Sequence, residues 1–368
     1  MYIHQRPDWP EFSWDSSLIS GKLAAVRHAH GQLSGELGMM TGPLRQRASL
    51  EALTEDIVRS SQIEGERLEP RSVRSSLARH LGIDLKSRAK ADRGVEGIVQ
   101  VTLDATRNAA QPLTAARLFG WHAALFPTGF SGLKQITTGA WRRGRMEVVS
   151  GAYGRERVHF VAPGADRVPQ DMERFLTWCN QTSGLDPVLK AAIAHFWFVT
   201  IHPFDDGNGR IGRAIGDLML VRAGNTPERW YSLSAQIMRE RQAYYAVLEA
   251  SQSGSLDITT WLDWFLECLG RAMSTARQTL ATIRAKARFW QRHAGLALND
   301  RQIKVLNRML DGFEGKLTSS KWAALAKCSQ DTAHRDIASL IAHGILIRGT
   351  GGGRSTSYEV VMPDGEAI

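Results

Sequence analysis

Cysteine is scarce in this chain of 368 residues, and long apolar runs are absent from it. The three cysteines, Cys179, Cys268 and Cys328, are widely spaced and form no metal-ligand pattern. This excludes a small disulfide-stapled domain and favours a reducing compartment. No apolar run approaches the roughly 18 residues of a membrane span, and the N-terminal residues, with Asp8 and Glu11, lack the apolar centre of a signal peptide. We therefore expect a cytoplasmic protein with no membrane partner.

Acidic residues are fewer than basic ones. Asp and Glu number 37 against 46 Lys and Arg, which gives a formal net charge of +9. A basic excess favours an anionic partner such as a nucleotide or a nucleic acid. Many solvated surfaces are also basic, so charge alone does not choose between these readings. The length allows two or three domains.

Apolar residues recur at helical spacing through most of the chain, so we expect a mainly α fold. The spacing predicts a helix over 50–63, a buried helix over 188–199 and a further helix over 211–219. The turn over 202–210 therefore lies between two core helices. Its last amides belong to a helix N-terminus, where the helix dipole favours anions.

This turn concentrates chemically active side chains. Residues 202–213 read His-Pro-Phe-Asp-Asp-Gly-Asn-Gly-Arg-Ile-Gly-Arg. Glycines let backbone N–H groups approach an oligophosphate, guanidinium groups match phosphate oxygens, and a carboxylate can hold Mg²⁺. A neighbouring imidazole can accept a proton. The run predicts phosphate chemistry on a nucleotide.

The run resembles the signature of Fic domains, usually written HxFx(D/E)GNGRxxR, and fills every required position. A second segment, Ser-Ser-Gln-Ile-Glu-Gly over 60–65, resembles the inhibitory motif of one Fic subgroup, (S/T)xxxE(G/N). Fic proteins are mostly helical and typically transfer AMP from ATP to a protein hydroxyl. The resemblance implies a self-inhibited, Mg²⁺-dependent adenylyltransferase that modifies Ser, Thr or Tyr of proteins, with its own chain as one candidate target.

The resemblance also implies roles for residues of the signature. His202 would be the catalytic base, and Asp206 would hold Mg²⁺ against the phosphates, while Asp205 would cap the turn. The other fixed positions would bind the nucleotide. An anion nest would be formed by Gly207, Asn208 and Gly209. Arg210 would hold the phosphate chain, and Arg213 would orient its terminal end.

The inhibitory motif would act on the same site. By resemblance, Glu64 would pair with Arg213 and take the guanidinium that the γ-phosphate needs, with Ser60 and Gly65 as the other fixed positions. An ordinary surface glutamate is the alternative reading of Glu64.

Two tyrosines follow the signature on a predicted helix. Relatives place part of the adenine pocket where Tyr244 and Tyr245 stand, and stacking on a base is chemically reasonable. Core packing is the alternative reading of both rings.

Two further elements stand apart from the helices. β-rich segments at 147–149 and 158–161 predict one hairpin over 146–161, which is either a docking edge for the protein target or a simple surface hairpin. Residues 298–361 read helix, helix, helix, hairpin, the order of a winged helix-turn-helix. Its partner, DNA or protein, stays open.

We expect four regions. They are an N-terminal helical region over 1–100 with the inhibitory helix at about 47–65, a Fic core over 101–270, a basic helical connector over 271–297, and a winged helix-turn-helix over 298–368. A homodimer is expected because dimers are common in the family. The alternatives are removal of AMP by water activated at Glu64, transfer of another nucleotide, or a winged-helix transcription regulator that uses the Fic domain as a nucleotide sensor.

Overall fold

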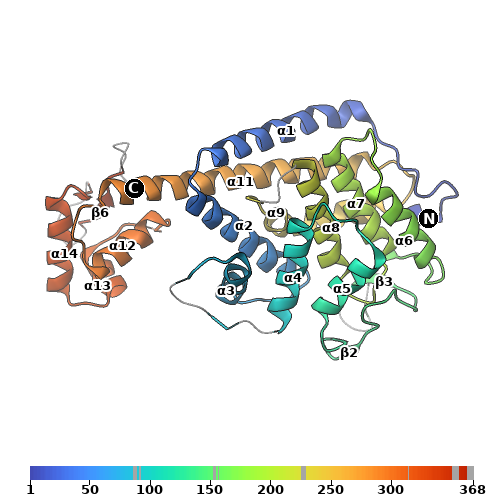
Figure 1. Cartoon of the computed structure of the whole chain (residues 1–368), viewed down its shortest axis with the longest axis horizontal. Helices are drawn as coiled ribbons and strands as arrows, with labels where there is room; N and C mark the ends of the chain where they lie inside the picture. The colour runs from blue at the N-terminus through green and yellow to red at the C-terminus, as the bar shows by residue number, and fades with distance from the viewer. Residues whose placement is uncertain are drawn as a thin grey trace. The chain divides into compact units, whose positions relative to one another are not determined.

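The computed structural model describes residues 1–85, 89–90, 93–151, 155, 157–224, 229–313, 315–349 and 356–362. The chain divides into two compact units, Met1–Ala276 and Arg277–Ile368. Helices dominate both units (Figure 1), as the apolar spacing predicts. Within the described ranges, every helix is too short or too polar to span a bilayer.

The first unit begins with a short 3-10 helix, Ile3–Gln5. The α-helices that follow in the described residues are α1 (Ser16–Gly38), α2 (Gly42–Ile63), α3 (Pro70–Leu81), α4 (Arg93–Arg107), α5 (Ala115–Leu125), α6 (Val168–Asn180), α7 (Pro187–Ile201), α8 (Asn208–Gly224), α9 (Leu233–Arg239) and α10 (Arg241–Ser251). The long helix α11 (Thr259–Arg292) begins in this unit and ends in the second. The basic stretch from 271 is therefore the later part of α11 and not a separate helix.

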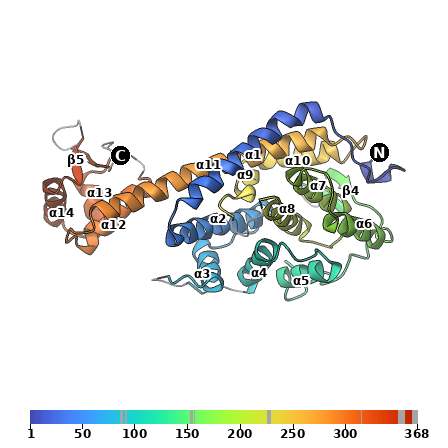
Figure 2. The same ribbon diagram turned by 45° about the horizontal axis from the view of Figure 1, so that its top comes forward.

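Helix α7 forms the centre of the first unit. Asp186 caps its start by accepting a hydrogen bond from the Val188 N–H at 2.8 Å. From Ala191 to Ile201 every residue is buried, because the sequence there is almost wholly apolar. Helix α8 packs against it, and α2 packs against α3 and α9 (Figure 2). The core thus fixes both helices that flank the turn at 202–207.

The strands form small antiparallel pairs. The predicted hairpin over 146–161 is confirmed as β3 (Glu147–Ser150) and β4 (Arg157–Val161). Residues 152–154 and 156 of its turn lie outside the described residues. A second, shorter pair, β1 (Phe130–Ser131) with β2 (Lys134–Gln135), was not predicted, because two-residue strands leave no alternation to detect.

The second unit has the element order that the sequence predicts. Helices α12 (Asp300–Leu310), α13 (Ser319–Ala326) and α14 (Gln330–Ala342) precede the antiparallel strands β5 (Leu346–Arg348) and β6 (Tyr358–Val360). Trp322, Leu340 and Val360 are fully buried in its own apolar core. The glycine-rich tip between the strands falls largely outside the described residues.

Candidate active site

The turn between α7 and α8 holds His202 in an unusual backbone conformation. His202 ends α7 with φ +53° and ψ +57°, in the left-handed region. A side chain in this region costs on the order of 1–2 kcal/mol. The surrounding structure must therefore hold the residue there, which is typical of functional sites.

Arg142 supplies part of that support. It is 2% exposed. Its Nε donates to the His202 carbonyl at 2.7 Å, and its backbone N–H donates to the Pro203 carbonyl at 2.9 Å. Its terminal nitrogens donate to the carbonyls of Gly144 at 2.8 Å and Pro163 at 2.5 Å. Sequence analysis missed this residue, because nothing in the letters separates buried Arg142 from its exposed neighbour Arg143.

The hydrogen bonding of the imidazole fixes its tautomer. Nδ1 of His202 lies 3.1 Å from the Val199 carbonyl, which can only accept. Nδ1 therefore carries the proton, and Nε2 is left as an acceptor. Burial lowers the pKa of His202 below 6.5, and the charge of Arg142 acts in the same direction against the opposing effects of Glu64 and Asp206. The ring is neutral at pH 7 and can accept a proton.

The two neighbouring aspartates have different partners. Asp205 accepts a hydrogen bond from the Thr137 N–H at 2.9 Å, so it holds the chain that follows β2. Asp206 accepts from the Gly207 N–H at 2.5 Å and from the hydroxyl of Ser131 on β1. Ser131 was not singled out from the sequence. Among the described residues, no group of three or more His, Cys, Asp or Glu is placed to hold a metal ion.

The Asn208 side chain secures the turn. It is buried, and its Oδ1 accepts from the Phe204 N–H at 2.9 Å while its Nδ2 donates to the Phe204 carbonyl at 2.8 Å. The Asn208 side chain therefore holds the backbone of Phe204. The first N–H groups of α8 have no carbonyl partner within the helix, so the amides of 208–210 form a site suited to an anion.

Residues at the end of α2 bind the Arg213 guanidinium group. The Arg213 side chain is 2% exposed, and its Nη1 forms an ion pair with Glu64 Oε1 at 2.8 Å. Its Nε donates to the Ser60 hydroxyl at 2.9 Å, and its Nη2 donates to the Ser60 carbonyl at 2.8 Å. The charge of Glu64 raises the pKa of Arg213 against the effect of burial. Ser60, Glu64 and Arg213 thus meet as the resemblance implies.

The Glu64 carboxylate also lies directly against the start of α8. A Cβ on Gly209 would come within 2.0 Å of Glu64 Oε1 and 3.2 Å of Arg213 Nη1. Glycine at 209 therefore allows a carboxylate, or another anion of similar size, to approach the helix end closely.

Arg210 is occupied by a residue that sequence analysis did not assign to the site. Its Nη1 donates to Glu66 Oε2 at 2.8 Å, and its guanidinium lies 5.0 Å from the centre of the Phe126 ring. Glu66 could have been noticed from its position just after the inhibitory motif. Its contact with Arg210 could not be predicted, because the amino-acid sequence does not show the direction of the chain after Gly65.

The two tyrosines lie in different surroundings. Tyr244 is 2% exposed, and its hydroxyl lies 2.9 Å from Nε2 of His195, which favours the core-packing reading. Burial lowers the pKa of His195 to about 3, so this ring is neutral. Tyr245 is 38% exposed, and its hydroxyl donates to the Ile63 carbonyl at 3.4 Å. Tyr245 thus touches the end of α2.

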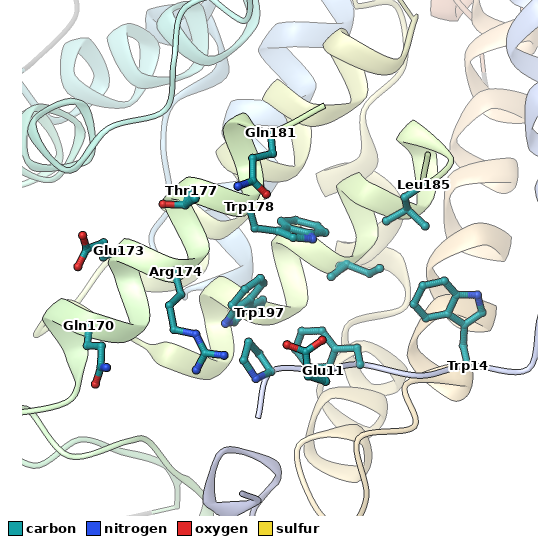
Figure 3. Close-up of a pocket in the computed structure, with 13 residues that line it drawn as sticks. Glu11, Trp14, Gln170, Glu173, Arg174, Thr177, Trp178, Gln181, Leu185 and Trp197 are labelled. Atoms are coloured by element: carbon teal, nitrogen blue, oxygen red, sulfur yellow. The ribbon is translucent and has the colours of Figure 1, made fainter. Parts of the chain in front are cut away.

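A separate pocket of about 610 Å³ lies between the N-terminal segment, α6 and α7 (Figure 3). Trp178 and Trp197 line it together with Glu11, Trp14 and Arg174, as Figure 3 shows. None of the residues that we predicted for the site borders this pocket. The first residues of the signature lie instead in the turn between α7 and α8.

Residues 112–220, which include the signature, match the Fic/DOC family. The chain contains a Fic domain. This confirms the resemblance drawn from the signature. Residues 2–83, which include Ser60 and Glu64, match a domain of unknown function, DUF4172.

Known Fic proteins match part or most of the chain. The protein adenylyltransferase Fic of Drosophila grimshawi is 34% identical over 131 residues, which are 34% of this chain and 26% of that protein. That of Drosophila willistoni is also 34% identical over 131 residues and is covered to 25%. The match thus spans about a quarter of each relative.

Solved structures show the same fold. A Fic family protein from Desulfovibrio desulfuricans G20 has a TM-score of 0.54 at 22% identity, with 95% of this chain and 97% of that one covered. Fic-1 from C. elegans has a TM-score of 0.51 at 19% identity, covering 73% of this chain and 75% of that one. The Fic-type helical fold is therefore established.

Proposed function

We propose that the chain is a protein adenylyltransferase that its own helix α2 holds inactive. The named relatives and the complete signature support AMP transfer. The ion pair between Glu64 and Arg213 supports self-inhibition. This contact is the observation that carries the proposal, because it joins two predicted motifs through their two predicted charged residues.

In the proposed reaction a Ser, Thr or Tyr hydroxyl of a protein attacks the α-phosphorus of ATP. The new O–P bond forms as the bond from the α-phosphorus to the bridging oxygen breaks, and pyrophosphate leaves. Nε2 of His202 accepts the hydroxyl proton, which suits a neutral imidazole whose Nδ1–H is held by Val199. The amides at the start of α8, Arg210 and Arg213 would hold the phosphates.

Asp206 fits a role in holding Mg²⁺. One of its oxygens accepts a hydrogen bond from the Gly207 N–H and the other accepts one from the Ser131 hydroxyl. Each oxygen keeps a free lone pair that could bind a metal ion. Mg²⁺ is typically bound by one or two carboxylates together with substrate phosphates, so a complete protein cage is not required. Bound there, the ion would neutralise phosphate charge. Asp205 accepts one hydrogen bond, from the Thr137 N–H, so the choice of Asp206 over Asp205 rests on the acidic position of the signature.

Inhibition follows from competition for Arg213. While Ser60 and Glu64 hold this guanidinium, the terminal phosphate of ATP has no partner at that position. The carboxylate also lies where an anion would approach Gly209. Removing the Glu64 side chain frees both places.

A transfer assay tests this proposal. Purified wild type, Glu64→Gly, and Glu64→Gly with His202→Ala are incubated with Mg²⁺ and ATP labelled at either the α- or the γ-phosphate. We expect protein-bound α-label to rise about tenfold or more in Glu64→Gly, equivalent to at least about 1.4 kcal/mol of relieved competition. The label should vanish in the double variant and be absent with γ-labelled ATP. No gain in Glu64→Gly, or label that survives His202→Ala, would contradict the proposal.

A further inference from the structure

Glu66 makes the second contact between the end of α2 and the signature. Its carboxylate accepts a hydrogen bond from Arg210 Nη1 at 2.8 Å, while Glu64 holds Arg213 at the same distance. We infer that Glu66 is a second inhibitory carboxylate, which occupies Arg210 as Glu64 occupies Arg213. This inference rests on the proposed nucleotide site and adds to its regulation.

One rigid cap aims both carboxylates. The Gly65 N–H donates to the Gln62 carbonyl at 3.0 Å, and the Glu66 N–H donates to the Ser61 carbonyl at 3.0 Å. This pair of bonds is the Schellman arrangement that ends a helix, and it needs a left-handed residue, here Gly65 with φ +86°. The backbone of Glu66 is therefore fixed together with that of Glu64, and this position lets the Glu66 carboxylate reach Arg210.

Arg210 has a hydrogen-bond donor that Glu66 does not use. Its side chain is 10% exposed, and among the described residues its Nε is buried without an acceptor. A buried donor without a partner is unfavourable, so this nitrogen favours a ligand oxygen nearby. A phosphate group would supply several oxygens, and it would compete with the Glu66 carboxylate for Nη1 of the same guanidinium group.

The inhibitory carboxylates and the guanidinium groups of the signature are equal in number. Two carboxylates from one helix end neutralise the two guanidinium groups that the signature offers to the phosphate chain. Each carboxylate stands in for part of the phosphate charge. ATP must therefore compete with two carboxylates to be held by both arginines.

The two contacts differ in their exposure to solvent. The Glu66 side chain is 46% exposed and Glu64 is 31% exposed, while their partners Arg210 and Arg213 are 10% and 2% exposed. Solvent and salt screen an exposed ion pair more than a buried one. Glu66 is thus the outer and more salt-sensitive of the two inhibitory contacts.

Nucleotide binding by charge-removing variants of the full chain tests this inference. The variants are Glu66→Gln, Glu64→Gln, the double variant and Glu55→Gln. Glu55 is a matched control, because it lies on α2 and its exposed ion pair is with Arg59, which is not part of the signature. The Glu55 Oε1 to Arg59 Nε distance is 2.8 Å. The probe is a non-transferable ATP analogue with Mg²⁺, titrated by calorimetry at low and at high salt. Thermal unfolding of each variant checks that the fold is kept.

We expect Glu66→Gln to bind the analogue roughly two- to fivefold more tightly than wild type at low salt, the range of an exposed ion pair, with little gain left at high salt. Glu64→Gln should keep its gain at high salt, the double variant should exceed both, and Glu55→Gln should bind as wild type does. If Glu64→Gln gains affinity but Glu66→Gln matches Glu55→Gln, this inference is overturned and the proposed function is kept. If no variant binds nucleotide, both are overturned.

Discussion

At the scale of single residues, the proposed reaction depends on the state of His202. Its ring is half-buried, its Nδ1–H faces the Val199 carbonyl, and Arg142 holds the carbonyl of the same residue. Burial and the Arg142 charge both favour the neutral ring. The structure thus prepares Nε2 as a proton acceptor before any substrate binds.

This state predicts the pH dependence of transfer. Because the pKa of His202 is lowered from 6.5, the base is neutral above that pH and becomes protonated only below it. Transfer by Glu64→Gly should therefore be flat from about pH 7 upward and fall only below pH 6.5. A pH–rate profile with labelled ATP measures this. A half-maximal point above pH 6.5 would mean that the neutral ring is not favoured.

Arg142 should act as a positioning residue. Arg142→Lys keeps the charge and the backbone N–H, but a single ammonium group cannot reach all three carbonyls, of His202, Gly144 and Pro163, that the guanidinium group holds now. Buried carbonyls would lose their donors, so we expect about 2–3 kcal/mol of lost stability by denaturant unfolding. In the Glu64→Gly background the rate of transfer should fall while nucleotide affinity changes little.

Arg143→Lys is the matched control for this change. Arg143 is the adjacent residue and is exposed, so its replacement should alter neither stability nor transfer. Equal effects of the two substitutions would show that Arg142 has no special place in the site.

At the scale of elements, the end of α2 is the part that we propose turns the site off. Gly65 is the residue that makes this end possible, since its φ of +86° lets the chain reverse after Glu64. No atom would meet a Cβ at this position. A substitution there therefore changes the backbone preference and little else.

We predict that Gly65→Ala raises transfer activity. Alanine disfavours this backbone conformation by about 1–2 kcal/mol, which loosens Glu64 and Glu66 together. The labelled-ATP assay should show an increase smaller than that of Glu64→Gly. Gly82→Ala is the control, because Gly82 ends α3 with φ +69° and also has open space around it. It should lose similar stability and gain no activity; an equal gain in both variants would refute the link to α2.

At the scale of the whole molecule, the chain joins a Fic domain over 112–220 to a preceding segment that reaches into the site. The resemblance to Fic proteins implied the pairing of Glu64 with Arg213, although the two residues lie far apart in the chain, because each belongs to a motif of that family. The sequence also predicted the helices around the turn, since their apolar spacing is strong.

The residues that sequence analysis missed share a physical cause. Arg142 and Ser131 act through hydrogen bonds to the backbone or to a neighbouring carboxylate, and such bonds depend on three-dimensional placement. The contact of Glu66 depends on the chain direction after Gly65. Tyr244 could not be separated from Tyr245, because adjacent aromatic residues on a helix differ in burial only once the packing is known. The homodimer and the partner of the second unit stay predictions.

We propose above all that the Glu64 carboxylate keeps an adenylyltransferase from using ATP. The decisive experiment is intact-mass spectrometry of wild type and Glu64→Gly, each incubated alone with ATP and Mg²⁺. We expect Glu64→Gly to gain the mass of one or more adenylyl groups while wild type stays largely unmodified. Equal masses for the two proteins, with or without the adduct, would contradict it.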